Sequence, residues 1–257
     1  MATRSGHCPS EMPTAPARPN SIAEPTYRPL CVRCLRAGSV CLCDGIRPFE
    51  TFFQVVLLQH PKERKNSIGT ARFTHLTLKN SLLIAGAEFE TDPAVSAILA
   101  DPENHAVVLF PGETSANLAE GRDAFLASIP VGPSGNPKRL VVFVIDGTWS
   151  QARGMIRKSA RLLALPRVSF TIDQPSQYKV RKQPREFCLS TVEATARLVK
   201  LLDPAAPAES LIETFAKMVD AQLECATRGR LREKPKYPRD SLPSTAEPAP
   251  CRGEVTG

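Results

Sequence analysis

Long apolar runs are missing from this chain of 257 residues. A membrane-spanning helix needs about 20 consecutive apolar residues, and the apolar stretches here are far shorter. The amino-terminal region carries Arg4 and many prolines but lacks the apolar segment of a secretory signal. Aromatic residues are also scarce, at 6% with a single tryptophan. We therefore expect a globular cytoplasmic protein without membrane contact. Because tryptophan occurs only once, its position in the sequence is of interest.

Acidic residues are scarce in the basic clusters. The net charge is +7; residues 179–185, KVRKQPR, contain no acid, and residues 228–239 set six basic residues against Glu233 alone. A third basic group follows an apolar run at residues 60–65. Clustered positive charge is typical of polyanion binding, but excess Lys and Arg also simply solvate a surface. Charge by itself leaves both interpretations open.

The chain divides into four parts by composition. Residues 1–28 are rich in proline and poor in apolar residues, which predicts a disordered tail, and residues 229–257 predict a second, basic and disordered tail. Between them we expect a cysteine-rich module over 29–49 and a catalytic domain over 50–228. The apolar pattern predicts strands at 54–59, 105–110, 140–145 and 168–172. It predicts helices at 70–84, 93–100, 116–128, 150–163, 190–201 and 208–226. Strands separated by helices pair in parallel, which predicts an α/β layered fold.

Four cysteines stand within thirteen residues, in the array CVRCLRAGSVCLC of residues 31–43. They are Cys31, Cys34, Cys41 and Cys43. In a reducing compartment such an array favours metal over disulfides, and four thiolates satisfy the tetrahedral preference of zinc with no position left open. The alternatives are a redox pair or small packed side chains. The spacing favours a structural zinc site.

Polar residues follow the predicted strands, at the edge where open α/β sheets bind ligands. The buried run 140–145 ends in Asp146, Gly147, Thr148 and Trp149. Two other strand ends add Gln59-His60-Pro61 and Phe110-Pro111-Gly112-Glu113-Thr114. The start of the helix predicted over 190–201 adds Ser190-Thr191-Val192-Glu193-Ala194.

Each of these groups also has a structural interpretation. Ser190 and Glu193 match a capping box, Asp146 could cap the following helix, and His60 could be a turn residue. Trp149 could be a packing anchor. Only their joint placement at strand ends favours a site.

The D-x-T-W residues at 146–149 resemble the signature of DTW-domain proteins, the tRNA-uridine aminocarboxypropyltransferases. The resemblance extends, in order, through the cysteine array, His-Pro-Lys-Glu at 60–63, Leu-Lys-Asn-Ser at 78–81, Phe-Pro-Gly-Glu at 110–113 and Ser-Thr-Val-Glu-Ala at 190–194. It covers roughly residues 28–228. It implies transfer of the 3-amino-3-carboxypropyl group of S-adenosylmethionine to N3 of a tRNA uridine, with release of methylthioadenosine. It also implies a SPOUT-like layered sheet with a deep knot in the cofactor region.

That chemistry assigns roles to the residues at the strand ends. Asp146 would remove the uracil proton. Alternatively, Asp146 would orient Thr148 or bind the amino group of the cofactor. Trp149 would stack on a base. The cofactor would be held by Pro111, Gly112, Glu113, Ser190, Thr191 and Glu193. The tRNA phosphates would meet Lys62, Arg64, Lys65, Arg181, Lys182 and Arg185.

Two other classes of function stay open at this point. A SPOUT-like tRNA methyltransferase would use the same cofactor and surface but present another carbon. A non-catalytic zinc-containing RNA-binding module would bind tRNA and no cofactor. The sequence does not indicate which uridine or which tRNAs are used, the oligomeric state, or the identity of the metal.

Overall fold

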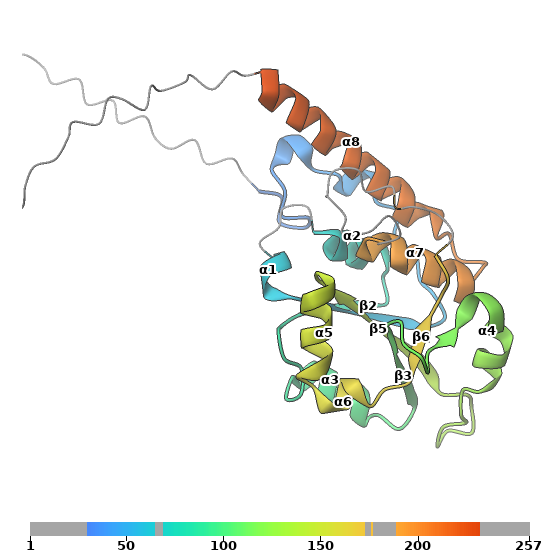
Figure 1. Cartoon of the computed structure of the whole chain (residues 1–257). Coiled ribbons are helices and arrows are strands. Elements are labelled where there is room, and N and C mark those ends of the chain that lie inside the picture. Colours follow the sequence, from blue (N-terminus) through green and yellow to red (C-terminus); the bar gives the residue numbers. More distant parts are fainter. Residues whose placement is uncertain (1–29, 65–68, 173–175, 177–188, 232–257) are drawn as a thin grey trace, which may run out of the picture.

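A six-stranded parallel sheet forms the centre of the protein (Figure 1). The computed structural model describes residues 30–64, 69–172, 176 and 189–231. The strand order is β2-β1-β5-β3-β6-β4. The strands are β1 (Gln54–Gln59), β2 (Ser81–Ala85), β3 (Asn104–Leu109), β4 (Ala116–Asn117), β5 (Arg139–Asp146) and β6 (Arg167–Ser169).

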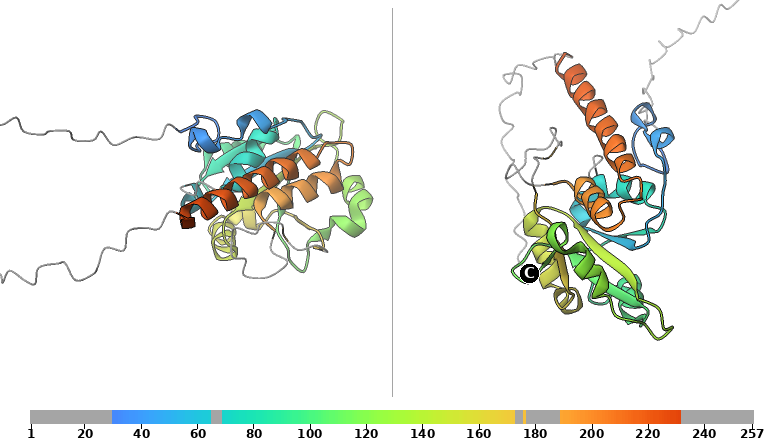
Figure 2. Two further views of the ribbon diagram at one scale, coloured as in Figure 1. Left: turned by 90° about the horizontal axis from the view of Figure 1, so that it is seen from above. Right: turned by 90° about the vertical axis from the view of Figure 1, so that its right-hand side faces the viewer.

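Helices cover both faces of the sheet, as two views at right angles show (Figure 2). One face carries α2 (Thr70–Thr77), α4 (Leu118–Ala127), α7 (Thr191–Leu202) and α8 (Glu209–Leu231). The other carries α3 (Pro93–Ala100), α5 (Trp149–Arg157) and α6 (Ala160–Leu163). A short helix, α1 (Pro61–Arg64), follows β1, and two 3₁₀ turns at Gly38–Val40 and Cys43–Gly45 lie in the cysteine segment. The layered α/β fold is confirmed, and within the described residues no helix is long and apolar enough to cross a membrane.

The alternation of side chains along β5 explains the two layers. Leu140, Val142 and Val144 enter the core beneath α7 and α8, whereas Val141 and Phe143 enter the core beneath α3 and α5. Successive side chains of a strand point to opposite faces, so a run that is apolar at every position must be covered on both. This central strand therefore holds the two cores together.

The helix predicted over 70–84 is wrong in its second half. Helix α2 ends at Thr77, and Ser81–Ala85 forms edge strand β2, parallel to β1. The side-chain amide of Asn80 donates to the carbonyls of Thr51 (2.8 Å) and Phe53 (2.9 Å) at the turn between them. A short apolar run such as that in SLLIA does not distinguish strand from helix by periodicity, and here its pairing with β1 decides.

The helix predicted over 150–163 is also interrupted. It consists of α5 and α6, with Ser159 between them accepting from the backbone N–H of Leu162 and donating to Glu90 at 2.9 Å. Two further predictions are too long. The strand predicted over 168–172 starts one residue earlier and ends at Ser169, as β6 (Arg167–Ser169), and residues 116–117 of the predicted helix form β4 before α4.

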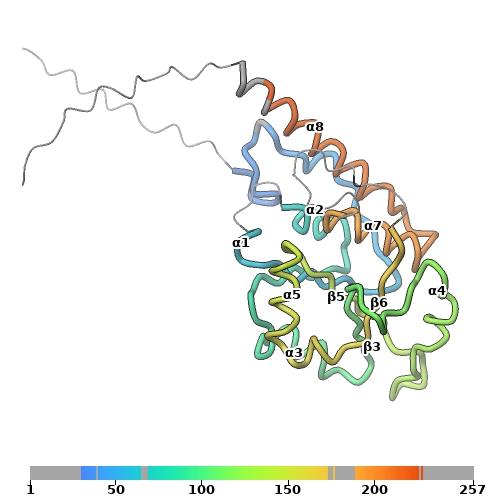
Figure 3. The backbone as a smooth tube through the Cα atoms, viewed as in Figure 1, coloured from blue at the N-terminus to red at the C-terminus, as the bar shows by residue number. Residues whose placement is uncertain are grey.

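The cysteine segment packs onto the carboxyl-terminal helix, far away in sequence (Figure 3). Cys34, Cys43 and Ile46 share one hydrophobic core with Phe215 and Met218 of α8. The segment is thus joined to the α7–α8 layer by apolar burial.

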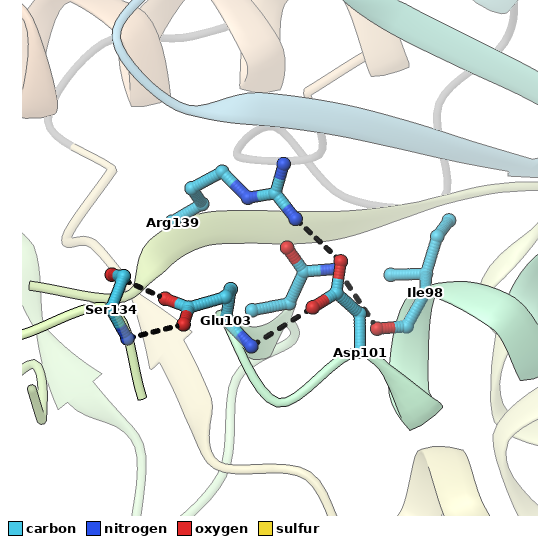
Figure 4. Close-up of polar contacts among 6 residues, drawn as sticks. Ile98, Asp101, Glu103, Ser134 and Arg139 are labelled. Carbon is cyan, nitrogen blue, oxygen red and sulfur yellow. Dashed lines mark hydrogen bonds and ion pairs between the residues drawn. The ribbon is translucent and has the colours of Figure 1, made fainter. Parts of the chain in front are cut away.

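Polar contacts hold the opposite, amino-terminal ends of β3 and β5 (Figure 4). Arg139 at the start of β5 pairs with Asp101 at 2.5 Å, and the Asp101 carboxylate also accepts from the backbone N–H of Glu103. The Glu103 carboxylate accepts from the N–H (2.6 Å) and hydroxyl (2.9 Å) of Ser134. These groups fix each other around the strand starts.

Candidate functional site

Asp146 is the centre of a hydrogen-bonded group that joins three elements. It ends β5 with only 5% of its surface exposed, and it lies opposite Gln59 in the parallel register with β1. Its Oδ2 accepts from Nε2 of Gln59 at 2.9 Å, and its Oδ1 accepts from the hydroxyl of Thr191, the first residue of α7, at 2.5 Å. Both oxygens of this buried carboxylate therefore accept hydrogen bonds, one from each side of the site.

The chain approaches itself closely beside this carboxylate. The backbone N–H of His60 donates to the carbonyl of Asp146 at 2.9 Å. A Cβ atom placed on Gly147 would lie 3.1 Å from Oε1 of Gln151 and 3.5 Å from Cβ of His60. A side chain at residue 147 would crowd Gln151, whereas its contact with His60 would be an ordinary one, so packing against Gln151 explains the glycine of the motif.

Thr148 acts as the N-cap of α5. Its hydroxyl accepts from the backbone N–H of Gln151 at 3.3 Å, and the Gln151 side chain accepts from the Thr148 N–H at 2.6 Å, which completes a capping box. The interpretation of Asp146 as this cap is therefore wrong, because the N-cap is Thr148, two residues later.

An aromatic cavity of about 180 Å³ lies next to the Asp146 group. Trp149 is 43% exposed and meets Phe110 edge to face, with ring centroids 5.8 Å apart. The Thr191 hydroxyl belongs to the same lining, so the hydrogen bond to Asp146 begins at the cavity wall. The lining residues are Leu109, Phe110, Pro111, Val144, Ile145, Gly147, Trp149, Ala152, Ser169, Phe170, Ile172, Leu189, Thr191 and Ala194.

The residues expected to hold a cofactor are only partly brought together. Pro111 and Thr191 line this cavity. Glu113 lines a separate cavity of about 830 Å³ between α4 and the start of β6, and Gly112 packs beneath Arg167, whose Nη1 would lie 2.9 Å from an added Cβ.

The capping-box interpretation of Ser190 and Glu193 is confirmed at the start of α7. The Glu193 carboxylate is 7% exposed and accepts from the N–H and hydroxyl of Ser190 at 2.8 and 2.6 Å. The hydroxyl of Ser176 also donates to it, at 2.7 Å. These contacts account for both residues structurally.

Cys31, Cys34, Cys41 and Cys43 form a compact thiol cluster. Their four Sγ atoms lie within 4.8 Å of one another, and the Cys31–Cys43 and Cys34–Cys41 Sγ pairs are each 3.7 Å apart. A tetrahedral ion with Zn–S bonds of about 2.3 Å would set the sulfurs about 3.8 Å apart. Backbone hydrogen bonds from Cys34 and Arg33 lower the pKa of the Cys31 thiol to about 6, whereas burial raises that of Cys43. The cluster can hold a metal ion.

The basic residues expected at the tRNA interface are described only in part. Lys62 and Arg64 are exposed on α1, which starts directly after His60. Lys65, Arg181, Lys182 and Arg185 lie outside the described residues, as do the tail 1–28 and most of the tail 229–257.

The sequence interpretation missed two features of the site. The sequence predicts Gln59 only as a strand end and Phe170 only as part of a strand. A glutamine that ends the apolar run QVVLLQ was the available signal for Gln59, because parallel strand ends meet at one edge.

The part of the chain that contains the site and the cysteine cluster matches a known protein family. Residues 28–223 match the DTW domain. The chain belongs to the DTW-domain family.

Several relatives of this DTW-domain protein carry one name, tRNA-uridine aminocarboxypropyltransferase 2. The Mus musculus protein is 30% identical over 213 residues, which cover 80% of this chain and 68% of that protein. The Drosophila melanogaster protein is 33% identical over 190 residues, which cover 71% and 70%. An Arabidopsis thaliana protein named tRNA-uridine aminocarboxypropyltransferase A is 25% identical over 236 residues, covering 84% and 86%. No solved structure matches this DTW-domain chain.

Proposed function

We propose that this protein transfers the 3-amino-3-carboxypropyl group of S-adenosylmethionine to N3 of a uridine in tRNA. Membership of the DTW-domain family and the names of its relatives support the reaction class. The observation that carries the assignment of the site is the contact of Thr191 with Asp146, which connects an aromatic cavity to a buried carboxylate.

The cavity fits the chemistry of the cofactor. Two of its aromatic side chains, Phe110 and Phe170, offer flat apolar faces for an adenine, and aromatic faces attract cations such as a sulfonium. S-adenosylmethionine, when bound, supplies a carbon–sulfur bond that breaks as N3 attacks, so that methylthioadenosine leaves. Which of the sulfonium's carbons reacts is a matter of orientation, and we assign that orientation to the cavity wall.

Asp146 takes the uracil proton in this proposal, through Thr191. The N3 proton passes to the Thr191 hydroxyl as the hydroxyl proton moves to Oδ1 of Asp146, along the 2.5 Å hydrogen bond. A positioned base of this kind contributes roughly 10²–10⁴-fold to the rate. Thr148 supports the site by holding the start of α5.

The remaining site residues keep the roles that the family suggests. Trp149 stacks on a base of the RNA, a contact worth about 1–3 kcal/mol. Pro111, Gly112, Glu113, Ser190 and Glu193 shape or support the cofactor loops. Lys62, Arg64, Lys65, Arg181, Lys182 and Arg185 meet phosphates.

We also infer a structural zinc ion in the cysteine cluster and a SPOUT-like knot in the cofactor region. Four thiolates leave zinc no open position, so its part is to hold the segment that packs on α8. The knot prediction rests on the family resemblance, and the cofactor region includes residues beyond those described.

The reaction is tested by incubating the protein with labelled S-adenosylmethionine and unmodified tRNA and identifying nucleoside and by-product by mass spectrometry. We expect aminocarboxypropyl-uridine with methylthioadenosine. A methylated nucleoside together with S-adenosylhomocysteine would show that the protein is a methyltransferase instead. Binding of tRNA without any product and without affinity for the cofactor would show that it is a non-catalytic RNA-binding module.

Asp146→Asn tests the base in the same assay. Asparagine has nearly the size of aspartate. Its amide oxygen can still accept from Gln59, and its amide N–H can donate to the Thr191 hydroxyl, because a hydroxyl accepts as well as donates. We expect kcat to fall by about 10²–10⁴-fold while tRNA binding is unchanged. Unchanged kcat would reject Asp146 as the base.

A further inference from the structure

Helix α5 leads directly out of the candidate site. Its first residue, Trp149, lines the cavity, and Arg153 and Arg157 follow at intervals of four residues. Residues four apart lie on one face of a helix. With a rise of 1.5 Å per residue, the two arginines stand about 6 and about 12 Å further along the axis.

This face of α5 points away from the core. Trp149, Arg153 and Arg157 are exposed, whereas Ala152, Met155 and Ile156 are buried against the sheet layer. We call the three exposed residues the α5 stripe. It combines one aromatic ring at the cavity with two guanidinium groups beyond it.

The two guanidinium groups carry uncompensated charge. Among the residues that the structure describes, neither Arg153 nor Arg157 has an ion-pair or hydrogen-bond partner. The neighbouring cations differ in this respect, since Lys158 pairs with Glu88 at 2.7 Å and Arg161 donates to Ser96. Exposed charges without intramolecular partners are available to a ligand.

A second basic element begins beside the stripe. Helix α1, with exposed Lys62 and Arg64, starts after His60, whose backbone bonds to Asp146 just before α5. The two helices therefore follow residues that are hydrogen-bonded to each other, and the exposed side chains of Lys62, Arg64, Arg153 and Arg157 place positive charge on both helices.

We propose that the α5 stripe binds the RNA strand that carries the target uridine. Trp149 stacks on a base at the cavity, and Arg153 and Arg157 contact successive parts of the adjoining phosphate backbone. Arginine's planar fork matches phosphate geometry, and an exposed ring followed by cations fits a single strand with unstacked bases. The inference rests on the proposed function and adds the path of the substrate to it.

The test compares Arg153→Ala/Arg157→Ala with the wild-type chain, in binding of unmodified tRNA from 50 to 300 mM salt. Each phosphate contact contributes about 0.7–0.9 to the slope of log K against log salt. The double variant should therefore lower the slope by about 1.4–1.8 and raise the KM for tRNA, with kcat at saturating tRNA unchanged. Alanine is the better helix former, so α5 should remain folded.

Lys79→Ala/Lys200→Ala is the matched control. It removes the same net charge from exposed lysines that pair with Glu50 and Glu209 and do not lie on α5. The control should keep the wild-type slope. A wild-type slope in the stripe variant, or an equal loss in the control, would reject the inference.

Failure of the proposed function has a different signature. In that case the wild-type protein gives no aminocarboxypropyl-uridine, whatever the stripe variant does to binding. Normal product formation with an unaltered salt slope in the stripe variant would reject the stripe alone.

Discussion

At the scale of single residues, the site depends on how a carboxylate is held. Asp146 is buried and both of its oxygens accept hydrogen bonds, from Gln59 and Thr191. Thr191 reaches the cavity, whereas Gln59 is 3% exposed and lies behind the carboxylate. Gln59 is thus a positioning residue, which acts on the reaction only through Asp146.

Gln59→Met should lower kcat while leaving the KM for tRNA close to the wild-type value. The change keeps side-chain length but removes the donor to Oδ2, and loss of one partner of a buried polar group costs about 1–3 kcal/mol. Steady-state kinetics with urea unfolding separates the effect on the site from the loss of stability. A wild-type kcat would show that Thr191 alone positions Asp146.

Gln59→Glu supplies a readout that packing alone would not change. Two carboxylates would meet where the amide now lies 2.9 Å from Oδ2, and like charges disfavour ionisation of both. Because the reaction needs ionised Asp146, the activity should appear only at higher pH than in the wild type. An unshifted pH–rate profile would contradict the ionised base.

At the scale of elements, helix starts arrange the site. Thr148 caps α5 and thereby directs Trp149 to the cavity, and Ser190 with Glu193 caps α7 and thereby directs Thr191 to Asp146. Both caps stand immediately before a residue that lines the cavity. Local hydrogen bonds at two helix starts thus place the groups that we assign to substrate and base.

Thr148→Ala should lower the free energy of unfolding by about 1 kcal/mol, the usual loss for an N-cap hydroxyl. Thr148→Ser keeps the hydroxyl and should keep the stability. Denaturant unfolding of the pair, together with kcat, measures both roles. A large kcat loss in Thr148→Ala with wild-type stability would mean that the hydroxyl acts in the reaction and not as a cap.

At the scale of the whole molecule, the cysteine segment belongs to the main core. Cys34 and Cys43 pack with Phe215 of α8, so the thiol cluster fixes one end of the α7–α8 layer. A metal ion in the cluster would stabilise more than its own loop, because binding to the folded state adds to the stability of everything that unfolds with it.

Removal of the metal should therefore lower the Tm of the protein as one transition. We expect metal analysis to find one zinc per chain, and a chelator or Cys34→Ser to lower the Tm. Cys225→Ser, at an exposed free cysteine of α8, is the control and should leave Tm and metal content unchanged. A Tm insensitive to chelation would contradict the structural role.

Prediction from sequence succeeded where a pattern was long or chemically specific. The continuous apolar run of β5 predicted a doubly buried strand, and the spacing of Cys31, Cys34, Cys41 and Cys43 predicted the thiol cluster. It failed at β2, whose four apolar residues are too few to show a period. It also missed Gln59, since a polar residue at a strand end has no meaning until the neighbouring strand is known.

The sequence by itself determined the alternation of strands and helices, the cysteine cluster and the family, because each depends on residues close together or on an ordered set of motifs. Only the tertiary structure decided which of the motif residues meet. Parallel pairing of β1 with β5 brings Gln59 to Asp146, and the packing of α7 over the sheet brings Thr191 to the same carboxylate. Glu113 follows β3 in the chain, yet it lies at another cavity than Asp146. Strand order and helix packing are set by burial across the whole chain, and therefore no local pattern contains them.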